Sequence, residues 1–410
     1  MRDDPIGGWC DPAFLAVSRE FAANFAERGE LGAAVSVTVG GTVVAEFWGG
    51  RRDAQRREPW TRDTLVNVFS VGKGVLAACL ARVMGLGGLD PDAPVTRYWP
   101  EFAAAGKDEV TVRQLLSHQA GLPALHARQP AGRMLDWEYM TRALAAERPW
   151  WPPGTGHGYH VNTFGFLGGE LLRRITGQTP GAFLRAEIAG PLGADIHIGL
   201  AAADQGRVAE FLWPAGPSAA GAAPTAGAAA AAGAAPTAGA GAAAGSAPAR
   251  EASVPDTEMA MSAYFNPPDF SGLGVVNSAA WRSAEVPSAN AHATATGIAR
   301  LYAALAGGGT IDGVRVIDSG ALAAATCEQV YGEDLVLRRQ SRFGLGFQLT
   351  HPEREFGQGP GCFGHFGAGG SVGFCDPDAG LAFGYATNQM GSRWRNPRNR
   401  ALIDACYASL

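Results

Sequence analysis

Strand-forming stretches lie at both ends of this chain, and the residues between them have the spacing of helices. Near the N-terminus, GAAVSVTVGGTVVAEFWG at residues 32–49 contains two β-rich runs around Gly40-Gly41, which is a typical hairpin signal. The C-terminal part adds three predicted strands and a closing helix, at residues 343–350, 371–375, 381–387 and 398–408. We therefore expect an α/β fold of the α+β type, with one antiparallel sheet built from both termini and flanked by helices, plus an all-α lobe.

Several stretches of the sequence have apolar residues at helical spacing, and they cover residues 64–85, 111–118, 163–176 and 295–306. We assign the sheet domain to residues 1–88 and 290–410 and the mainly helical lobe to residues 89–289. Within the lobe, residues 214–250 are nearly pure Ala, Gly, Pro, Ser and Thr, and the unit GAAPTAG occurs twice. Because such a segment cannot bury enough apolar surface to offset its ordering entropy, we expect a flexible surface insertion.

The composition excludes several classes of partner. With a net charge of −5 the chain has no basic field for nucleic acid, and no run of eighteen apolar residues predicts a membrane span. The first five residues are not followed by the apolar core of a secretory signal, and the six cysteines are scattered without a CxxC pair. We therefore expect reduced thiols and a cytoplasmic protein. The eight histidines form no HExxH motif, so we expect no metal and no cofactor.

The lysines give the first sign of a catalytic site. Among 33 lysines and arginines only two are lysines, Lys73 and Lys107. Lys73 follows Ser70 by three residues in FSVGKG, near the start of a predicted helix, and this spacing places both side chains on one helix face. A desolvated lysine can lose its proton and act as base for a serine nucleophile, whereas an arginine cannot. The competing interpretation is a solvent-exposed lysine on an amphipathic helix.

Two glycine-rich segments would complete such a site. Tyr159 follows PGTGHG shortly before the helix at 163–176, and a tyrosine whose pKa is lowered by a neighbouring ammonium can act as general base and then as general acid. The segment GHFGAGGS at residues 364–371 begins a strand and can offer a backbone N–H to an oxyanion. Taken alone, the tyrosine is more simply a loop residue that caps the core, and the glycine segment a tight turn. The GGSVG match at residues 369–373 is not a nucleophile elbow, because a strand rather than a helix follows Ser371.

In this order, the motifs resemble those of the serine β-lactamase and penicillin-binding-protein fold. They are most similar to class C β-lactamase-related enzymes, especially the family VIII carboxylesterases. The matching stretches are VFSVGKG at 68–74, LLSHQAGL at 115–122, HGY at 157–159 and GHFG at 364–367. The resemblance covers nearly the whole chain except residues 214–250.

The resemblance implies a role for each motif residue. It makes Ser70 the nucleophile that attacks an acyl carbonyl, and Lys73 the group that takes or relays the serine proton. It gives Tyr159 a share of the base role and the protonation of the leaving group. The oxyanion hole would consist of the backbone amides of Ser70 and Ala368. His118 matches a structural position of the family, so we expect it to be buried and not catalytic.

Two departures from the family pattern bear on the substrate. Val161 stands where the family's YxN motif has asparagine, which removes one polar contact to the substrate. The KTG motif is replaced by His365, Phe366 and Gly367, which we assign to substrate binding. Since the missing lysine would hold the carboxylate of a β-lactam, the resemblance favours an ester with a neutral acyl group.

These residues predict a serine hydrolase that cleaves small-molecule carboxylic esters through an acyl-enzyme on Ser70. An acyltransferase acting on a small-molecule acceptor would use the same residues and stays open as an alternative. A β-lactamase or a peptidase for D-amino acids is less favoured, and a non-catalytic ligand-binding scaffold is least favoured because serine, lysine and tyrosine are all present. A further alternative makes His365 the base in a Ser-His arrangement. The expected partner is a small ester or acyl donor, and the sequence indicates no particular oligomeric state.

Overall fold

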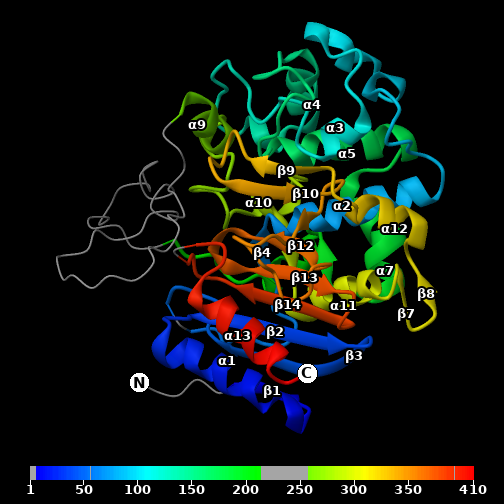
Figure 1. Cartoon of the computed structure of the whole chain (residues 1–410). Coiled ribbons are helices and arrows are strands. Elements are labelled where there is room, and N and C mark those ends of the chain that lie inside the picture. The colour runs from blue at the N-terminus through cyan, green and yellow to red at the C-terminus, as the bar shows by residue number, and fades with distance from the viewer. Residues whose placement is uncertain (1–5, 56, 214–256, 392) are drawn as a thin grey trace, which may run out of the picture.

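A computed structural model describes residues 6–55, 57–213, 257–391 and 393–410 of the chain. The predicted insertion at 214–250 lies outside these residues. The described chain contains a nine-stranded antiparallel sheet to which both ends contribute (Figure 1). In spatial order its strands are β1 (Gly7–Cys10), β3 (Thr42–Gly50), β2 (Gly32–Val39), β14 (Leu381–Thr387), β13 (Val372–Asp376), β12 (Phe363–Phe366), β11 (Gln348–Leu349), β10 (Gln340–Phe343) and β9 (Val330–Glu333). The sheet predicted from the two ends is therefore confirmed.

The two ends of the chain meet in the middle of this sheet. β2 pairs antiparallel with β14 over nearly its whole length. β2 turns into β3 through Gly40 and Gly41, whose φ angles of 57° and 82° are left-handed and suit a tight hairpin turn. The hairpin predicted at 32–49 and the strand predicted at 381–387 are thus both confirmed.

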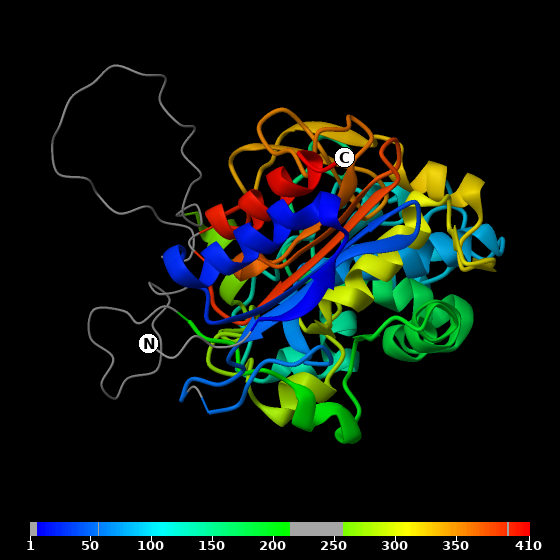
Figure 2. The same ribbon diagram turned by 90° about the horizontal axis from the view of Figure 1, so that it is seen from below.

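Helices cover both faces of the sheet. On one face α1 (Leu15–Glu27) and α13 (Pro397–Tyr407) pack against each other, and α11 (Ala295–Ala306) crosses the other face beside β14 and β2 (Figure 2). Aromatic rings fill the space under α1, where Phe21 stacks on Phe47 with 6.0 Å between ring centroids. The predicted closing helix is confirmed to within one residue at each end.

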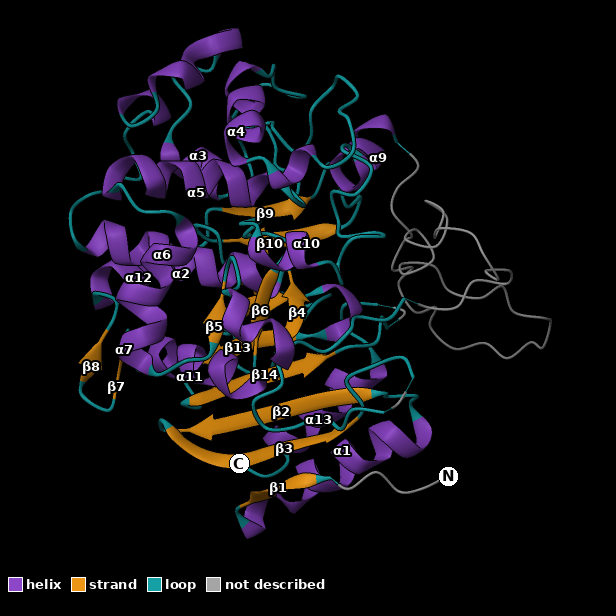
Figure 3. Cartoon of the chain, turned by 180° about the vertical axis from the view of Figure 1, so that it is seen from behind, coloured by secondary structure: helices purple, strands orange, loops and turns teal. Residues whose placement is uncertain are grey.

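The helical lobe lies at the end of the sheet that holds β9 and β10 (Figures 1 and 3). Its helices and those that connect it to the sheet are α3 (Val112–Leu116), α4 (Trp137–Ala146), α5 (Thr163–Thr176), α6 (Pro180–Leu184), α7 (Gly190–Leu192), α9 (Glu258–Phe265), α10 (Ala279–Ser283) and α12 (Ser319–Thr326). The helices predicted at 163–176 and 295–306 are confirmed at both ends, whereas α3 stops two residues before the predicted 118. Among the described helices, none is long and apolar enough to cross a membrane.

The segment predicted as one helix at 64–85 is a strand followed by a helix. β4 (Val66–Phe69) comes first, and α2 (Val71–Gly85) begins only after Ser70. β4 pairs with β6 (Ala291–Ala293) in a second sheet, which is completed by β5 (Ile196–His197). The helical prediction was wrong at its start because the partner strand lies far away in the sequence, and local spacing cannot show such pairing. A third, two-stranded sheet consists of β7 (Thr310–Ile311) and β8 (Val314–Arg315).

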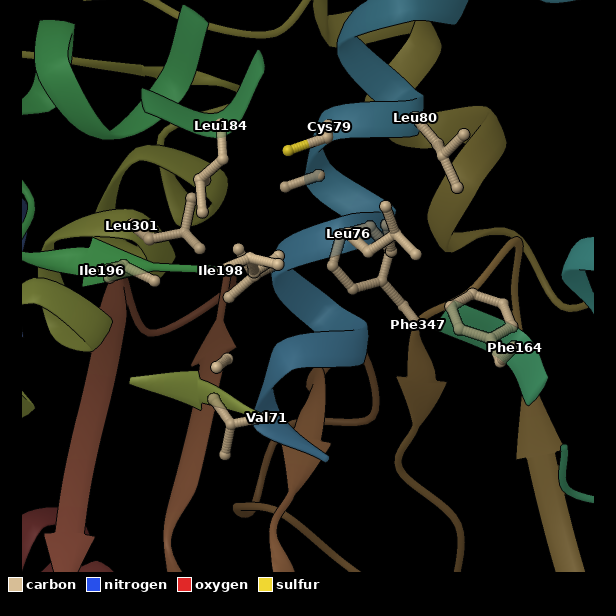
Figure 4. Packing of buried hydrophobic residues seen from close by; sticks show 14 of the residues in the cluster. Val71, Leu76, Cys79, Leu80, Phe164, Leu184, Ile196, Ile198, Leu301 and Phe347 are labelled. Carbon is tan, nitrogen blue, oxygen red and sulfur yellow. The ribbon is translucent and has the colours of Figure 1, made fainter. Parts of the chain in front are cut away.

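α2 is buried along most of its length and lies at the centre of the molecule. It packs against β12, α5, α6 and α12. Figure 4 shows its side chains among residues from the lobe and the sheets, including Phe164, Leu184, Ile196, Ile198, Leu301 and Phe347. A helix that is buried all round is held rigidly, so the residues at its N-terminus have a fixed position.

The strand predicted at 343–350 is broken in the middle. β10 ends at Phe343, and β11 begins only at Gln348. Between them the chain turns at Gly346, where a side chain would collide with Ala77 of α2 and with Phe164. The prediction of one strand was wrong because the chain bends here to pack closely on the central helix.

Candidate active site

Ser70 stands at the junction of β4 and α2, directly after a strained residue. Phe69 has a left-handed backbone with φ 48°, a conformation that costs energy for a non-glycine residue and clusters at active sites. Ser70 is the N-cap of α2 and is partly exposed, whereas Lys73 in the first turn is fully buried. Lys73 Nζ lies 2.9 Å from Ser70 Oγ. The structure therefore brings the two side chains together.

The other partners of the buried Lys73 amine are main-chain carbonyls. Nζ lies 2.5 Å from the Val161 oxygen and 3.2 Å from the Ser288 oxygen. No carboxylate among the described residues forms an ion pair with it, and burial lowers the pKa of Lys73 well below its usual value. A neutral amine has two N–H donors and one lone pair. In this neutral form the two N–H groups can donate to the two carbonyls, and the lone pair can accept the hydrogen of the Ser70 hydroxyl.

Tyr159 lies in the loop before α5 with its phenol buried beside Lys73. Lys73 Nζ is 4.7 Å from the centre of the ring, and the Tyr159 hydroxyl lies near the Ser70 side chain. Burial raises the pKa of Tyr159 well above its usual value, and the interaction with Ser70 offsets this only in part. The expectation that an ammonium would lower this pKa was wrong, because the neighbouring lysine is itself desolvated. Tyr159 therefore remains a phenol that can donate a proton.

A buried carboxylate holds the Tyr159 backbone in place. Asp334, in the loop between β9 and β10, is fully buried. Its Oδ1 accepts hydrogen bonds from the amides of Tyr159 at 3.0 Å, Val336 at 2.9 Å and Leu337 at 2.8 Å. Its Oδ2 accepts one from Ser341 Oγ at 2.9 Å. Asp334 could not be predicted from the sequence, because nothing near it links it to a tyrosine 175 positions away.

His365 contacts the site through Tyr159. Its Nδ1 lies 2.8 Å from the Phe366 oxygen, so Nδ1 carries the hydrogen and Nε2 turns its lone pair toward the Tyr159 hydroxyl at 3.5 Å. Burial and the nearby Lys73 lower the pKa of His365 to about 3, which leaves the ring neutral. The group next to the Ser70 oxygen is thus an amine, and this geometry does not favour the Ser-His alternative.

The residues that follow His365 offer main-chain rather than side-chain groups. The Phe366 ring is buried on the α1 side of the sheet, where it stacks on Phe356 at 4.5 Å. A side chain at Gly367 would collide with the Val68 carbonyl, so this loop runs close beside the strand that leads to Ser70. Within the described part of the chain, the Ala368 N–H donates no hydrogen bond. It is available to an oxygen of a bound substrate.

Three further expectations can be compared with the structure. His118 is fully buried among the rings of Tyr159, His160 and Phe343, and burial lowers its pKa well below the usual value, so the expected burial is confirmed. Ser371 is buried and precedes β13, which confirms that GGSVG is not a nucleophile elbow. Among the described residues, no group of histidine, cysteine and acidic side chains could hold a metal ion.

Comparison with known proteins places the chain in a family. A family model described as Beta-lactamase matches residues 17–407. The chain belongs to this β-lactamase family. Esterase/beta-lactamase LipL of Mycobacterium tuberculosis is 34% identical over 389 residues, which are 94% of this chain and 83% of the relative. Esterase EstB of Burkholderia gladioli is 31% identical over 210 residues, which are 46% of this chain and 53% of the relative.

Solved structures agree with this family over almost the entire chain. A family VIII carboxylesterase superimposes with a TM-score of 0.85 and 38% identity, covering 99% of this chain and 100% of the other. A penicillin-binding-protein homologue from Caulobacter crescentus also gives a TM-score of 0.85, with 39% identity and the same coverage. The β-lactamase-like fold class and the resemblance found in the sequence are therefore confirmed.

Proposed function

We propose that this chain is a serine carboxylesterase, which cleaves esters of small molecules through an acyl-enzyme on Ser70. The 2.9 Å contact between Lys73 Nζ and Ser70 Oγ carries the proposal, because this lysine forms no ion pair among the described residues and burial lowers its pKa. A relative named as an esterase/β-lactamase and a family VIII carboxylesterase structure, both similar over most of the chain, support ester hydrolysis.

In the proposed reaction, Ser70 Oγ attacks the ester carbonyl carbon while its proton passes to Lys73 Nζ. The N–H groups of Ser70 and Ala368 donate hydrogen bonds to the carbonyl oxygen as it becomes an oxyanion. Tyr159 gives its hydroxyl proton to the departing alkoxide, and the Lys73 ammonium restores the proton of the phenol. Water then attacks the acyl-enzyme, with the same pair acting in the reverse direction.

The proposed substrate has an uncharged acyl group. His365 stands where a β-lactamase of this family would offer a lysine, and its lowered pKa of about 3 leaves it neutral, which supports this choice. We propose that the His365 ring and the main chain of Phe366 and Gly367 line the substrate site. A cytoplasmic location is also a proposal, supported by six cysteines that are all free.

Turnover of p-nitrophenyl butyrate tests the function. Ser70→Ala, Lys73→Met and Lys73→Arg should each lower kcat by at least about a thousandfold, since losing a nucleophile or its base has effects of this size. Lys107→Met is the matched control, because Lys107 is also fully buried but lies outside the site, and its folded protein should keep the wild-type kcat. An acyl-enzyme on the Ser70 peptide, trapped and identified by mass spectrometry, is expected only when Ser70 is intact.

Two results would contradict the proposal. Wild-type kcat in Lys73→Arg would exclude proton transfer by this lysine, because arginine does not give up its proton. Acylated product in place of free acid, when butanol or an amine is added, would favour the acyltransferase alternative over hydrolysis.

A further inference from the structure

A buried ion pair lies behind the loop that carries the Ala368 amide. Arg398 Nη1 donates to Glu30 Oε1 at 2.8 Å, and the two side chains are 5% and 0% exposed. The hydroxyls of Thr387 and Tyr385 also donate to this carboxylate. The pair therefore joins the segment between α1 and β2 to β14 and α13.

The second nitrogen of the Arg398 guanidinium reaches the loop itself. Nη2 donates to the Gly369 oxygen at 3.1 Å and to the Gln389 oxygen at 2.9 Å. The Gly369 oxygen also accepts from Asn396 Nδ2 at 3.2 Å and from the Gly391 amide at 3.0 Å. Three donors thus converge on one carbonyl of the loop.

The glycine-rich loop needs such anchors. Gly369 and Gly370 have φ angles of 88° and 115°, which glycine adopts readily but at a large loss of conformational entropy. Inside the loop, the Gly367 amide donates to the Ser371 oxygen at 2.7 Å. From outside, Asn399 Nδ2 donates to the Gly370 oxygen at 2.9 Å. The start of α13 therefore supplies much of what fixes the loop conformation.

We infer that Arg398, held in place by Glu30, is a positioning residue for the oxyanion hole. Anchoring the Gly369 carbonyl restrains this short loop, in which the Ala368 N–H that is proposed to stabilise the oxyanion lies two peptide groups earlier. A donor fixed in advance acts most strongly in the transition state, and a displacement of about 1 Å lowers a rate by about a hundredfold. The inference rests on the proposed function, because it concerns the same site.

Arg398→Lys tests this role. Lysine keeps a charge beside Glu30 but cannot reach Glu30 and Gly369 with two separate nitrogens. We expect kcat/KM for p-nitrophenyl butyrate to fall by about tenfold to a hundredfold. Affinity for a trifluoromethyl ketone, whose adduct with serine carries an oxyanion, should fall by the same factor. An unreactive ether analogue of the ester should bind as it does to the wild type.

Glu170→Gln is the matched control. Like Glu30, Glu170 is a buried carboxylate that forms ion pairs with arginine. It has two arginine partners and lies on α5 in the helical lobe. The control should lower thermal stability and leave the ratio of ketone to ether affinity unchanged. If Arg398→Lys does not fold, Asn396→Asp takes its place, because aspartate keeps the cap of α13 while turning a donor to Gly369 into an acceptor. The same loss of ketone affinity is expected.

Three results would overturn the inference. The first is an unchanged ketone affinity in a folded Arg398→Lys or Asn396→Asp protein, and the second is an equal loss of ketone affinity in Glu170→Gln. The third is a failure of both Arg398→Lys and Asn396→Asp to fold, which would make the network purely structural. The proposed function is tested separately by Ser70→Ala. If ester turnover disappears in Ser70→Ala but stays at the wild-type level in Arg398→Lys, the function stands and the positioning role is refuted.

Discussion

The two lysines of this chain are both buried, but their amines have different partners. Lys107 Nζ contacts three main-chain oxygens, those of Ala104 at 2.6 Å, Ala145 at 3.0 Å and Glu147 at 2.5 Å, so each proton of an ammonium has an acceptor. Lys73 Nζ contacts two carbonyls and the Ser70 hydroxyl, which can either accept from an ammonium or donate to the lone pair of a neutral amine. Burial lowers the pKa of Lys107 to about 8 and that of Lys73 more strongly.

This difference predicts the pH dependence of ester turnover. The active form of Lys73 is the free amine, so kcat/KM should fall as the pH drops through the lowered pKa of this lysine. On the alkaline side no loss is expected up to the ordinary pKa of tyrosine, about 10, because the pKa of Tyr159 is raised. A pH–rate profile with a neutral ester measures both limbs. A decline beginning near neutral pH on the alkaline side would contradict this assignment.

The same groups predict how stability changes with pH. A lysine with a lowered folded pKa binds fewer protons in the folded state, so the wild type gains stability relative to a Lys→Met variant as the pH rises toward the unfolded value of 10.5. The expected slope is about 1.4 kcal/mol per pH unit. For Lys107→Met the slope should begin only near the lowered pKa of about 8, and for Lys73→Met at lower pH. Urea unfolding across this range measures the difference, and identical onsets would contradict it.

At the scale of elements, the β9–β10 hairpin fixes the backbone of Tyr159. Asp334→Ala would leave several buried donors without an acceptor, which should lower the free energy of unfolding by roughly 3 kcal/mol and reduce kcat. Asp334→Asn keeps one oxygen for the amides, and Ser341 can rotate to accept from the new amide group, so its loss of stability should be smaller. Urea unfolding and ester kinetics of both variants measure these effects.

Asp334→Asn also tests whether the charge of Asp334 matters apart from its hydrogen bonds to the backbone. The carboxylate is one of the groups that raise the pKa of Tyr159, so its neutralisation should lower that pKa and move the alkaline loss of activity to lower pH. An alkaline limb identical to that of the wild type, in a folded variant, would show that Asp334 acts only through the backbone.

Signals that act over short distances made several elements predictable. The Gly40-Gly41 turn, the glycine after residue 176 and the short spacing of Ser70 and Lys73 are all readable within one stretch of sequence. β4 could not be predicted, because its pairing with β6 joins distant segments. The ion pair behind the Ala368 loop could not be predicted for the same reason. Glu30 and Arg398 are 368 positions apart and meet only in the folded protein.

At the scale of the whole molecule, the site is assembled from segments that the sheet brings together. Ser70 and Lys73 come from the start of α2, Tyr159 from the loop before α5, and Ala368 from the turn between β12 and β13. Figure 1 shows these elements side by side. The pairing of β2 with β14 joins the N-terminal and C-terminal strands in one sheet, and α13 packs beside α1 on one face of that sheet. The last residues of the chain therefore contribute to the core and to the site.

This dependence predicts the effect of removing α13. A chain that ends at Asn396 loses the buried side chains of Leu402, Ile403 and Cys406, which contribute about 2 kcal/mol each. It also leaves Glu30 buried without its arginine, at a further cost of about 4 kcal/mol. The sum equals a typical total stability of about 10 kcal/mol. We therefore expect no cooperative unfolding transition and no ester turnover.

A chain that ends at Ala408 is the control, because it keeps the whole of α13 and lacks only Ser409 and the exposed Leu410. It should unfold and turn over ester like the full chain. Circular dichroism during thermal unfolding, together with ester kinetics, compares the two shortened chains. α13 supplies both the apolar side chains that pack on the sheet and the guanidinium that anchors the loop with the Ala368 amide. Stability and turnover should therefore be lost together. A chain ending at Asn396 that stayed folded but inactive would separate the two roles and assign α13 to the site alone.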